Sequence, residues 1–352
     1  MLVRASGGWC GFLLVAGLAI SGCAAQWTPR TATPTVALQW PYAPAPPKVT
    51  YLHSLSGLDR AADVGSVLRA VAFGSESEDR DAFVLPVAVA VGSDGRLAVA
   101  DLGRRCVHLY VPLEGRYVRL NGADDDPLLS PVAVAFDDAQ GLFVSDSVGK
   151  VLAFGADGTF RFALRKAGER ALARPTGLAY DRERKALYVV DTLASEIDVF
   201  EQDGRFAFSF GSRGDGAGQL NFPTHAFCSP RGELYVTDAM NFRVQIFDRD
   251  GKWLGGFGRH GDGSGDLAMP KGVVVDRDGV VYVVDGIFDN LQLFDRTGRF
   301  LLTVGARGTG FGELWLPSGA FIDDEDRLYV CDTYNRRIQV FRITRDYADA
   351  RS

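Results

Sequence analysis

Six aspartates recur along the chain at nearly constant intervals and are its most regular polar residues. Each ends a short apolar run, as Asp332 ends Leu328-Tyr329-Val330-Cys331. A ring of carboxylates could bind cations, but an aspartate at a strand end can also accept hydrogen bonds from backbone N–H groups of the next loop. We favour the second, structural role. The six residues are Asp101, Asp146, Asp191, Asp238, Asp285 and Asp332, and they lie 45 to 47 residues apart.

Metal or acid–base chemistry would need clustered histidines, cysteines or carboxylates. The chain has four histidines, of which His225 and His260 are neighbours in the repeat pattern. No third ligand accompanies these two, so whether they bind a metal stays open. The five cysteines form no C-x-x-C pair. Cys106 and Cys331 could pair in an exported protein, although small buried strand residues are the simpler interpretation.

The remaining motifs predict turns rather than cofactor sites. Asp248-Arg249-Asp250-Gly251 and Asp276-Arg277-Asp278-Gly279 begin like calcium loops, but neither continues to a glutamate at the twelfth position. Asp-Gly between strands is a strong hairpin signal. No P-loop, dinucleotide fingerprint or Ser-His-Asp arrangement occurs, and we expect no cofactor. The net charge of −6 argues against a nucleic-acid partner.

The elements that carry these residues repeat six times. Each repeat reads as strand, turn, strand, aspartate, loop, strand, hairpin and strand. Four antiparallel strands in about 45 residues predict an all-β, six-bladed β-propeller over residues 48–345, with one blade per repeat. A proline starts each repeat. These prolines are Pro86, Pro131, Pro175, Pro223, Pro270 and Pro317.

The last repeat lacks a fourth strand, because the chain ends soon after Ile338-Gln339-Val340-Phe341. Lys48-Val49-Thr50-Tyr51-Leu52-His53-Ser54 alternates apolar and polar residues as the fourth strands of other repeats do. We therefore expect the N-terminal strand to complete blade six. Closing the ring in this way removes the two exposed edges that an open array of sheets would have.

The N-terminal segments predict export. Residues 1–22 read as a signal peptide that ends in Ile20-Ser21-Gly22, and this sequence with Cys23 resembles the bacterial lipobox. The resemblance implies lipidation of Cys23, hence a lipid-anchored envelope protein, on the periplasmic side of the outer membrane. Residues 23–47, rich in proline, alanine and threonine, predict an extended tether. We expect a short helix within residues 58–74 and a tail at residues 346–352.

Two stretches resemble the NHL repeat. They are Asp238-Ala-Met-Asn-Phe-Arg-Val-Gln-Ile-Phe247 and Asp332-Thr-Tyr-Asn-Arg-Arg-Ile-Gln-Val-Phe341, together with glycine-rich connectors such as Gly211–Pro223. The resemblance implies an NHL-type propeller of the kind found in bacterial envelope lipoproteins. Earlier repeats depart from it, since Glu196 and Cys106 stand where Arg337 stands. NHL-type propeller lyases use several histidines and zinc, and this chain does not show such a set.

Repeats four to six predict a binding face. Their loops after the aspartates and their connectors gather aromatic and basic residues, the composition of interaction hot spots. Some of these side chains could instead pack between blades. The candidate residues are Met240, Phe242, Arg243, His260, Phe288, Trp315, Tyr334 and Arg336.

From these patterns we expect a membrane-anchored binding or scaffold protein for an envelope protein or polysaccharide. The alternative is a metal-dependent propeller enzyme, a lyase or a lactone hydrolase, with its site at the central channel. Stoichiometric zinc or calcium in the purified protein would favour the enzyme.

Overall fold

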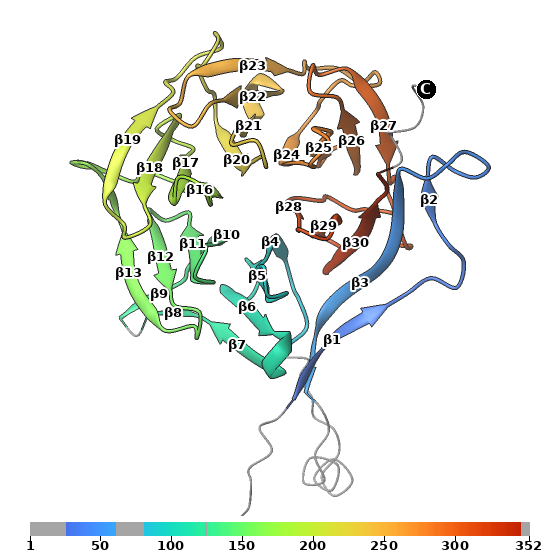
Figure 1. The fold of residues 1–352 in the computed structure, drawn as a ribbon, viewed down its shortest axis with the longest axis horizontal. Coiled ribbons are helices and arrows are strands. Elements are labelled where there is room, and N and C mark those ends of the chain that lie inside the picture. Colours follow the sequence, from blue (N-terminus) through green and yellow to red (C-terminus); the bar gives the residue numbers. More distant parts are fainter. Residues whose placement is uncertain (1–25, 61–80, 124, 346–352) are drawn as a thin grey trace, which may run out of the picture.

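A computed structural model describes residues 26–60, 81–123 and 125–345 and shows six antiparallel sheets arranged as a ring around a central axis (Figure 1). The all-β, six-bladed propeller expected from the repeats is confirmed. The predicted signal peptide, Cys23, the tail and most of the expected helix lie outside the described residues. No helix in the described ranges is long and apolar enough to cross a bilayer.

The first three blades follow one strand plan, with the first strand innermost. Blade one contains β4 (Pro86–Val91), β5 (Leu97–Asp101), β6 (Cys106–Val111) and β7 (Arg116–Leu120), with the 3-10 helix η1 (Pro112–Glu114) before β7. Blade two contains β10 (Pro131–Phe136), β11 (Leu142–Asp146), β12 (Lys150–Phe154) and β13 (Phe160–Leu164). Blade three contains β16 (Pro175–Asp181), β17 (Ala186–Asp191), β18 (Glu196–Glu201) and β19 (Phe206–Phe210).

Blades four and five repeat the same order, and the early connectors carry small ladders of their own. Blade four contains β20 (Pro223–Cys228), β21 (Leu234–Asp238), the 3-10 helix η2 (Ala239–Asn241), β22 (Arg243–Phe247) and β23 (Trp253–Phe257). Blade five contains β24 (Pro270–Val275), β25 (Val281–Asp285), β26 (Asn290–Phe294) and β27 (Phe300–Val304). The connector ladders are β8 (Gly122–Ala123) with β9 (Asp126–Pro127), and β14 (Lys166–Ala167) with β15 (Arg170–Ala171).

Blade six joins the two ends of the described chain. Its strands β28 (Ala320–Ile322), β29 (Arg327–Asp332) and β30 (Arg337–Ile343) are completed by β3 (Val49–Arg60). β3 pairs antiparallel with β30 from Val49 opposite Ile343 to Leu55 opposite Ile338. The expected closure by the N-terminal strand is confirmed.

Part of the predicted tether is folded onto blade six. β1 (Trp27–Ala32) pairs with β3 as a further outer strand, and β2 (Gln39–Trp40) pairs with its start. The expectation of an extended tether is wrong over these strands because two tryptophans provide apolar anchors. Trp40 is 6% exposed and packs edge-on against Phe341, and Trp27 lies on Tyr117. Pro29 is tolerated because β1 is an edge strand.

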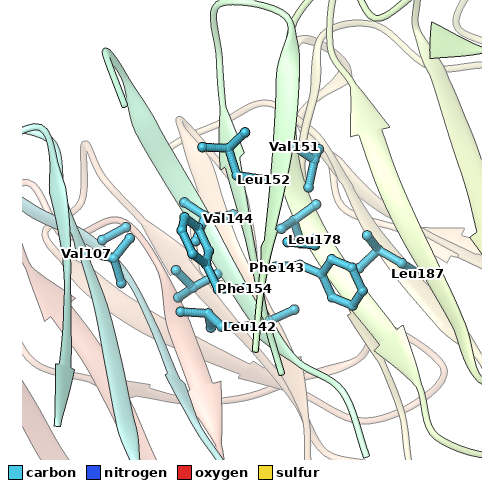
Figure 2. Packing of buried hydrophobic residues seen from close by; sticks show 14 of the residues in the cluster. Val107, Leu142, Phe143, Val144, Val151, Leu152, Phe154, Leu178 and Leu187 are labelled. Carbon is cyan, nitrogen blue, oxygen red and sulfur yellow. The ribbon is translucent and has the colours of Figure 1, made fainter. Parts of the chain in front are cut away.

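The hydrophobic core lies between the blades. The middle strands β11 and β12 are buried at every position, because both faces of each sheet pack against a neighbouring sheet. Figure 2 shows one such cluster, in which Phe143 of blade two lies toward Leu187 of blade three, whereas Leu152, on the other face of blade two, lies toward Val107 of blade one. Burying a side chain of this size contributes about 1.5–3 kcal/mol, so inter-blade packing is the main source of stability.

The six repeated aspartates are structural, as expected. Each is fully buried, and each accepts backbone hydrogen bonds from the connector that precedes its blade. Asp101 accepts from Val84 and Leu85 at 2.7 and 3.0 Å, and Asp332 accepts from Trp315 at 2.8 Å. The sequence interpretation named only the following loop as donor, and this loop adds a bond in some blades, such as that from Arg104 to Asp101. Each carboxylate therefore ties the start of its blade to the end of the second strand.

A positive partner for the carboxylate comes from different places in different blades. In blades four and six it is the arginine five residues later, with Arg243 Nε 2.8 Å from Asp238 and Arg337 Nε 2.7 Å from Asp332. In blade three that position is Glu196, and Arg170 of β15 provides the positive charge that pairs with Asp191 instead.

The Arg170 guanidinium in blade three joins two buried carboxylates. It lies 2.8 Å from Asp191 and 2.6 Å from Asp198, both fully buried. Burial raises the pKa of Asp198 despite its hydrogen bonds from Ser209 and Arg170. The departure from the repeat at Glu196 is thus compensated by a residue of the connector, and the carboxylate keeps its structural function.

We predict that Arg170→Gln destabilises the protein because Asp191 and Asp198 would then lie buried without a cation. Since the Arg170 side chain is itself 36% exposed, we expect a loss of about 2 kcal/mol of unfolding free energy, less than for a fully buried pair. Denaturant unfolding at pH 7 measures it. Adding Glu196→Arg and Asp198→Gln, which restores the arrangement of blades four and six, should recover most of the loss. An unchanged unfolding midpoint in the single variant would contradict this role for Arg170.

Candidate ligand-binding channel

The innermost strands define the two ends of the central channel. Each runs from its proline, next to the connector, to the hairpin that leads into the second strand. The connectors and the loops after the aspartates therefore form one face of the ring, here called the loop face. The six hairpins between first and second strands surround the channel at the opposite face, here called the hairpin face.

The channel is narrow toward the loop face because neighbouring inner strands approach each other closely there. Gly272 N donates to Ser318 O and Gly319 N donates to Val87 O, both at 3.0 Å. A side chain at Gly319 would place Cβ 2.5 Å from Val87 O, and one at Gly177 would place it 2.6 Å from His225 Cα. Glycine is required at these positions for the backbones to meet.

Hydroxyl groups directly after the second strands hold these inner strands in place. Thr192 Oγ1 donates to Pro223 O at 2.7 Å and thereby joins blade three to blade four. Thr333 Oγ1 donates to Pro86 O at 2.9 Å and joins blade six to blade one. The narrow end is therefore a belt of inter-blade hydrogen bonds, which gives the cavity beyond it a fixed floor.

Toward the hairpin face the channel widens into a cavity of about 350 Å³. Its walls come from the second halves of the inner strands and are mostly aliphatic and aromatic. The aromatic residues are Phe136, Tyr180, Phe227 and Phe321, from blades two, three, four and six. Phe227 and Phe321 pack edge to face with ring centroids 6.4 Å apart. A cavity of this size and composition suits the apolar body of a small organic molecule.

Two polar side chains of blade four line the same cavity. His225 has its pKa lowered to about 4 by burial, so its imidazole is neutral at pH 7 and can accept or donate a hydrogen bond. Burial raises the pKa of the Cys228 thiol, with a further contribution from the Asp181 carboxylate. Cys228 is therefore a protonated thiol rather than a reactive thiolate.

The mouth of the cavity is ringed by charges of both signs. Arg249 Nε lies 2.7 Å from Asp181 and the same guanidinium contacts Glu183. Arg182 of blade three lies 3.0 Å from Asp324 of blade six, on the opposite side of the ring (Figure 1). Burial raises the pKa of the neighbouring Asp276, which accepts a hydrogen bond from Tyr282 at 3.0 Å.

The residues predicted from the sequence to bind a partner lie on the loop face, away from this cavity. Met240 and Tyr334 are 57% and 52% exposed, and Trp315, 37% exposed, packs against Tyr334 with ring centroids 5.8 Å apart. Arg336 and His260 are also exposed. Whether this face binds a partner stays a prediction.

Two of the predicted residues make contacts within the protein, and a third is half-buried. Arg243 donates to Asp238 and to the carbonyls of Asp215, Gly216 and Gln219, so its guanidinium holds the connector rather than facing a partner. Phe242 is half-buried and packs on His260 with centroids 4.4 Å apart. Phe288 is likewise half-buried.

The open questions on metal and disulfide are addressed by the geometry. Among residues 26–60, 81–123 and 125–345, no group of three or more His, Cys, Asp or Glu side chains is arranged to hold a metal. Neither His225 nor His260 belongs to such a group within these ranges. Cys106 and Cys331 are free and fully buried, as expected for small strand residues.

Comparison with known proteins supports the fold. A family model described as a six-bladed β-propeller matches residues 273–351. No curated protein matches the sequence. Among solved structures, a streptogramin B lyase shares 11% identity at a TM-score of 0.56, over 74% of this chain and 93% of that one. A gluconolactonase from Xanthomonas campestris shares 20% identity at a TM-score of 0.57, over 74% and 87%. At these identities the likeness shows the propeller fold alone.

We predict a pH-dependent contribution of His225 to stability. Its folded-state pKa of about 4 lies below the ordinary value of 6.5. Between these values the unfolded chain binds more protons, so stability falls as pH is lowered from about 6.5 to about 4, by of the order of 2 to 3 kcal/mol. His225→Asn should lose this part of the pH dependence. The check is the difference in Tm between pH 7 and pH 4.5 for both proteins, and equal differences would contradict the prediction.

Proposed function

We propose that this protein is an exported, lipid-anchored binding propeller of the NHL type, whose central channel takes a small organic ligand with an apolar body. The observation that carries the proposal is the cavity of about 350 Å³ with aromatic residues from four blades on its wall. Binding sites for small molecules are typically concave and apolar, with a few placed polar groups, and this cavity offers His225 and a charged mouth. Lipidation at Cys23 would keep the propeller at the envelope membrane.

The alternative is a propeller enzyme. Two structural neighbours bear the names of enzymes, a lyase and a gluconolactonase, so propellers of this shape can carry chemistry. A metal-dependent version would need a ligand set that the described residues do not provide at the cavity. Binding without a metal is therefore the function that the geometry supports best.

Binding in the cavity can be tested with the neutral fluorescent probe N-phenyl-1-naphthylamine, which has an aromatic body and no charge. We predict that the protein binds this probe and that Cys228→Trp, which fills the cavity from its wall, weakens binding at least about tenfold, a loss of 1.4 kcal/mol or more. Val36→Trp, at a site 70% exposed and away from the cavity, is the matched control. Absence of binding, or equal affinity in the two variants, would rule the proposal out.

A second candidate is a protein partner on the loop face, as the sequence suggested. Here an apolar side chain stands two residues after the buried aspartate in five of the six blades, and each is about half exposed or more. These residues are Val148, Leu193, Met240, Ile287 and Tyr334. One exposed apolar residue at the same place in each of these blades spreads an apolar surface over the loop face, and such surfaces favour protein contacts.

We predict that a photo-crosslinking amino acid at position 334 captures an envelope partner in intact cells. Ile287→Ser in the same protein should reduce this adduct several-fold, because the partner would lose apolar contact on the neighbouring blade. The control is the same crosslinker at Asp203, in the hairpin between β18 and β19 at the outer rim. Equal adducts at both positions would show that the loop face is not a specific interface.

A further inference from the structure

One carboxylate joins three hairpins across the mouth of the cavity. Arg182 of blade three donates to Asp324 Oδ2 at 3.0 Å. Arg277 of blade five donates to the backbone oxygen of Asp324 at 2.8 Å, and its guanidinium lies 3.6 Å from Oδ1. All three residues line the cavity. Because blades three and six face each other in the ring, the Arg182–Asp324 pair spans the opening (Figure 1).

The other arginines near the mouth are held by buried acids. Arg249 pairs with Asp181, which is 4% exposed, and Arg327 pairs with Asp323, which is 9% exposed. Those pairs cannot open without leaving a buried charge, which is costly. The guanidinium groups of Arg249 and Arg327 are therefore not available to bind a ligand.

Arg182 and Arg277 differ because their acid is exposed. The side chains of Arg182, Arg277 and Asp324 are 53%, 46% and 58% exposed. In the described ranges no other carboxylate lies within ion-pair distance of either arginine. Exposed ion pairs contribute little to stability, so Asp324 can turn away into solvent at small cost. Two guanidiniums would then be available directly above an apolar cavity.

The remaining acids of the mouth are held by other side chains. Asp181 and Glu183 share Arg249, Asp323 pairs with Arg327, and Asp326 contacts Arg345. Asp276 is buried below the rim and bonded by Tyr282. Each of these acids therefore keeps a partner of its own, whereas Arg182 and Arg277 lose theirs when Asp324 turns away.

We propose that the natural ligand carries one oxyanion, a carboxylate, sulfate or sulfonate, on its apolar body, and that Asp324 occupies the place of this oxyanion in the free protein. The inference rests on the proposed function, since it assumes that the cavity binds the body. Arginine suits the task because its planar guanidinium presents paired N–H donors to an oxyanion. Asp324 acts as an internal anion that competes with the ligand for Arg182 and Arg277. A ligand without a negative charge does not displace Asp324, so it gains no binding free energy from the two arginines.

Two fluorescent probes that differ in charge test this assignment. 8-Anilinonaphthalene-1-sulfonate has the same aromatic body as N-phenyl-1-naphthylamine and adds a sulfonate. We expect Asp324→Asn to tighten binding of the sulfonate probe about three- to tenfold, because a competing charge is removed, and to leave the neutral probe unchanged. Arg182→Gln with Arg277→Gln should weaken the sulfonate probe about tenfold and again leave the neutral probe unchanged.

The controls locate the effect. Asp250→Asn removes an exposed acid from an equivalent arginine pair, with Arg184, that does not line the cavity. It should alter neither probe, which separates the local contact from a change in net charge. Cys228→Trp should weaken both probes, which places them in the cavity. Since all substituted charges are about half exposed or more, unchanged Tm values are expected and serve as the folding check.

The outcomes separate the two proposals. If the neutral probe binds in the cavity but the sulfonate probe responds to neither Asp324→Asn nor the double arginine variant, the oxyanion assignment is wrong and the binding function stands. A parallel change of both probes in these variants also overturns the assignment. If neither probe binds, both proposals fail. A sulfonate probe that alone tightens in Asp324→Asn and alone weakens without the arginines supports the assignment.

Discussion

The hydrogen bonds from each connector to a buried aspartate hold the propeller's geometry in place. Each carboxylate is withdrawn from water, which is costly unless its oxygens are satisfied. It is satisfied only when the connector before the blade and the end of the second strand lie together, as Asp101 requires of Val84 and Leu85. Six such constraints set where each inner strand begins.

Ring closure turns these local constraints into a rigid body. β3 ties the first described residues to β30, and Thr333 joins blade six to Pro86 of blade one. In this ring the inner strands cannot move apart at their narrow end without breaking inter-blade hydrogen bonds. At the hairpin face the blades are joined instead by side chains of the turns, such as Arg249 with Asp181 and Arg182 with Asp324. A rigid narrow end of the channel, combined with hairpin turns whose sequence can vary, allows one fold to be adapted to different ligands.

The two faces of the ring offer different chemistry. The loop face carries exposed apolar residues at one position of the repeat. Arg243 and Arg337 on this face donate hydrogen bonds to connector carbonyls. The hairpin face combines an apolar cavity with charges, and Arg182 and Arg277 at its mouth share one exposed acid, Asp324. A small ligand and a larger partner could therefore be bound at once, on opposite sides of the same rigid ring.

The amino-acid sequence by itself determined the repeat, the blade plan, the closing strand and the structural role of the aspartates. These features follow from residue spacing and local chemistry, such as the apolar run before Asp332. Such local patterns can be read from the sequence because they do not depend on how the sheets pack against one another. Only the tertiary structure decided what contacts what across the ring. Arg182 and Asp324 are 142 residues apart, and Arg170 replaces an arginine that its own repeat lacks. The packing of Trp40 against Phe341, which holds part of the expected tether on blade six, was likewise not predictable from the sequence pattern. Such contacts depend on how six sheets close around one axis. Closure brings together residues that are far apart in the sequence, and no local sequence pattern predicts which of them will be in contact.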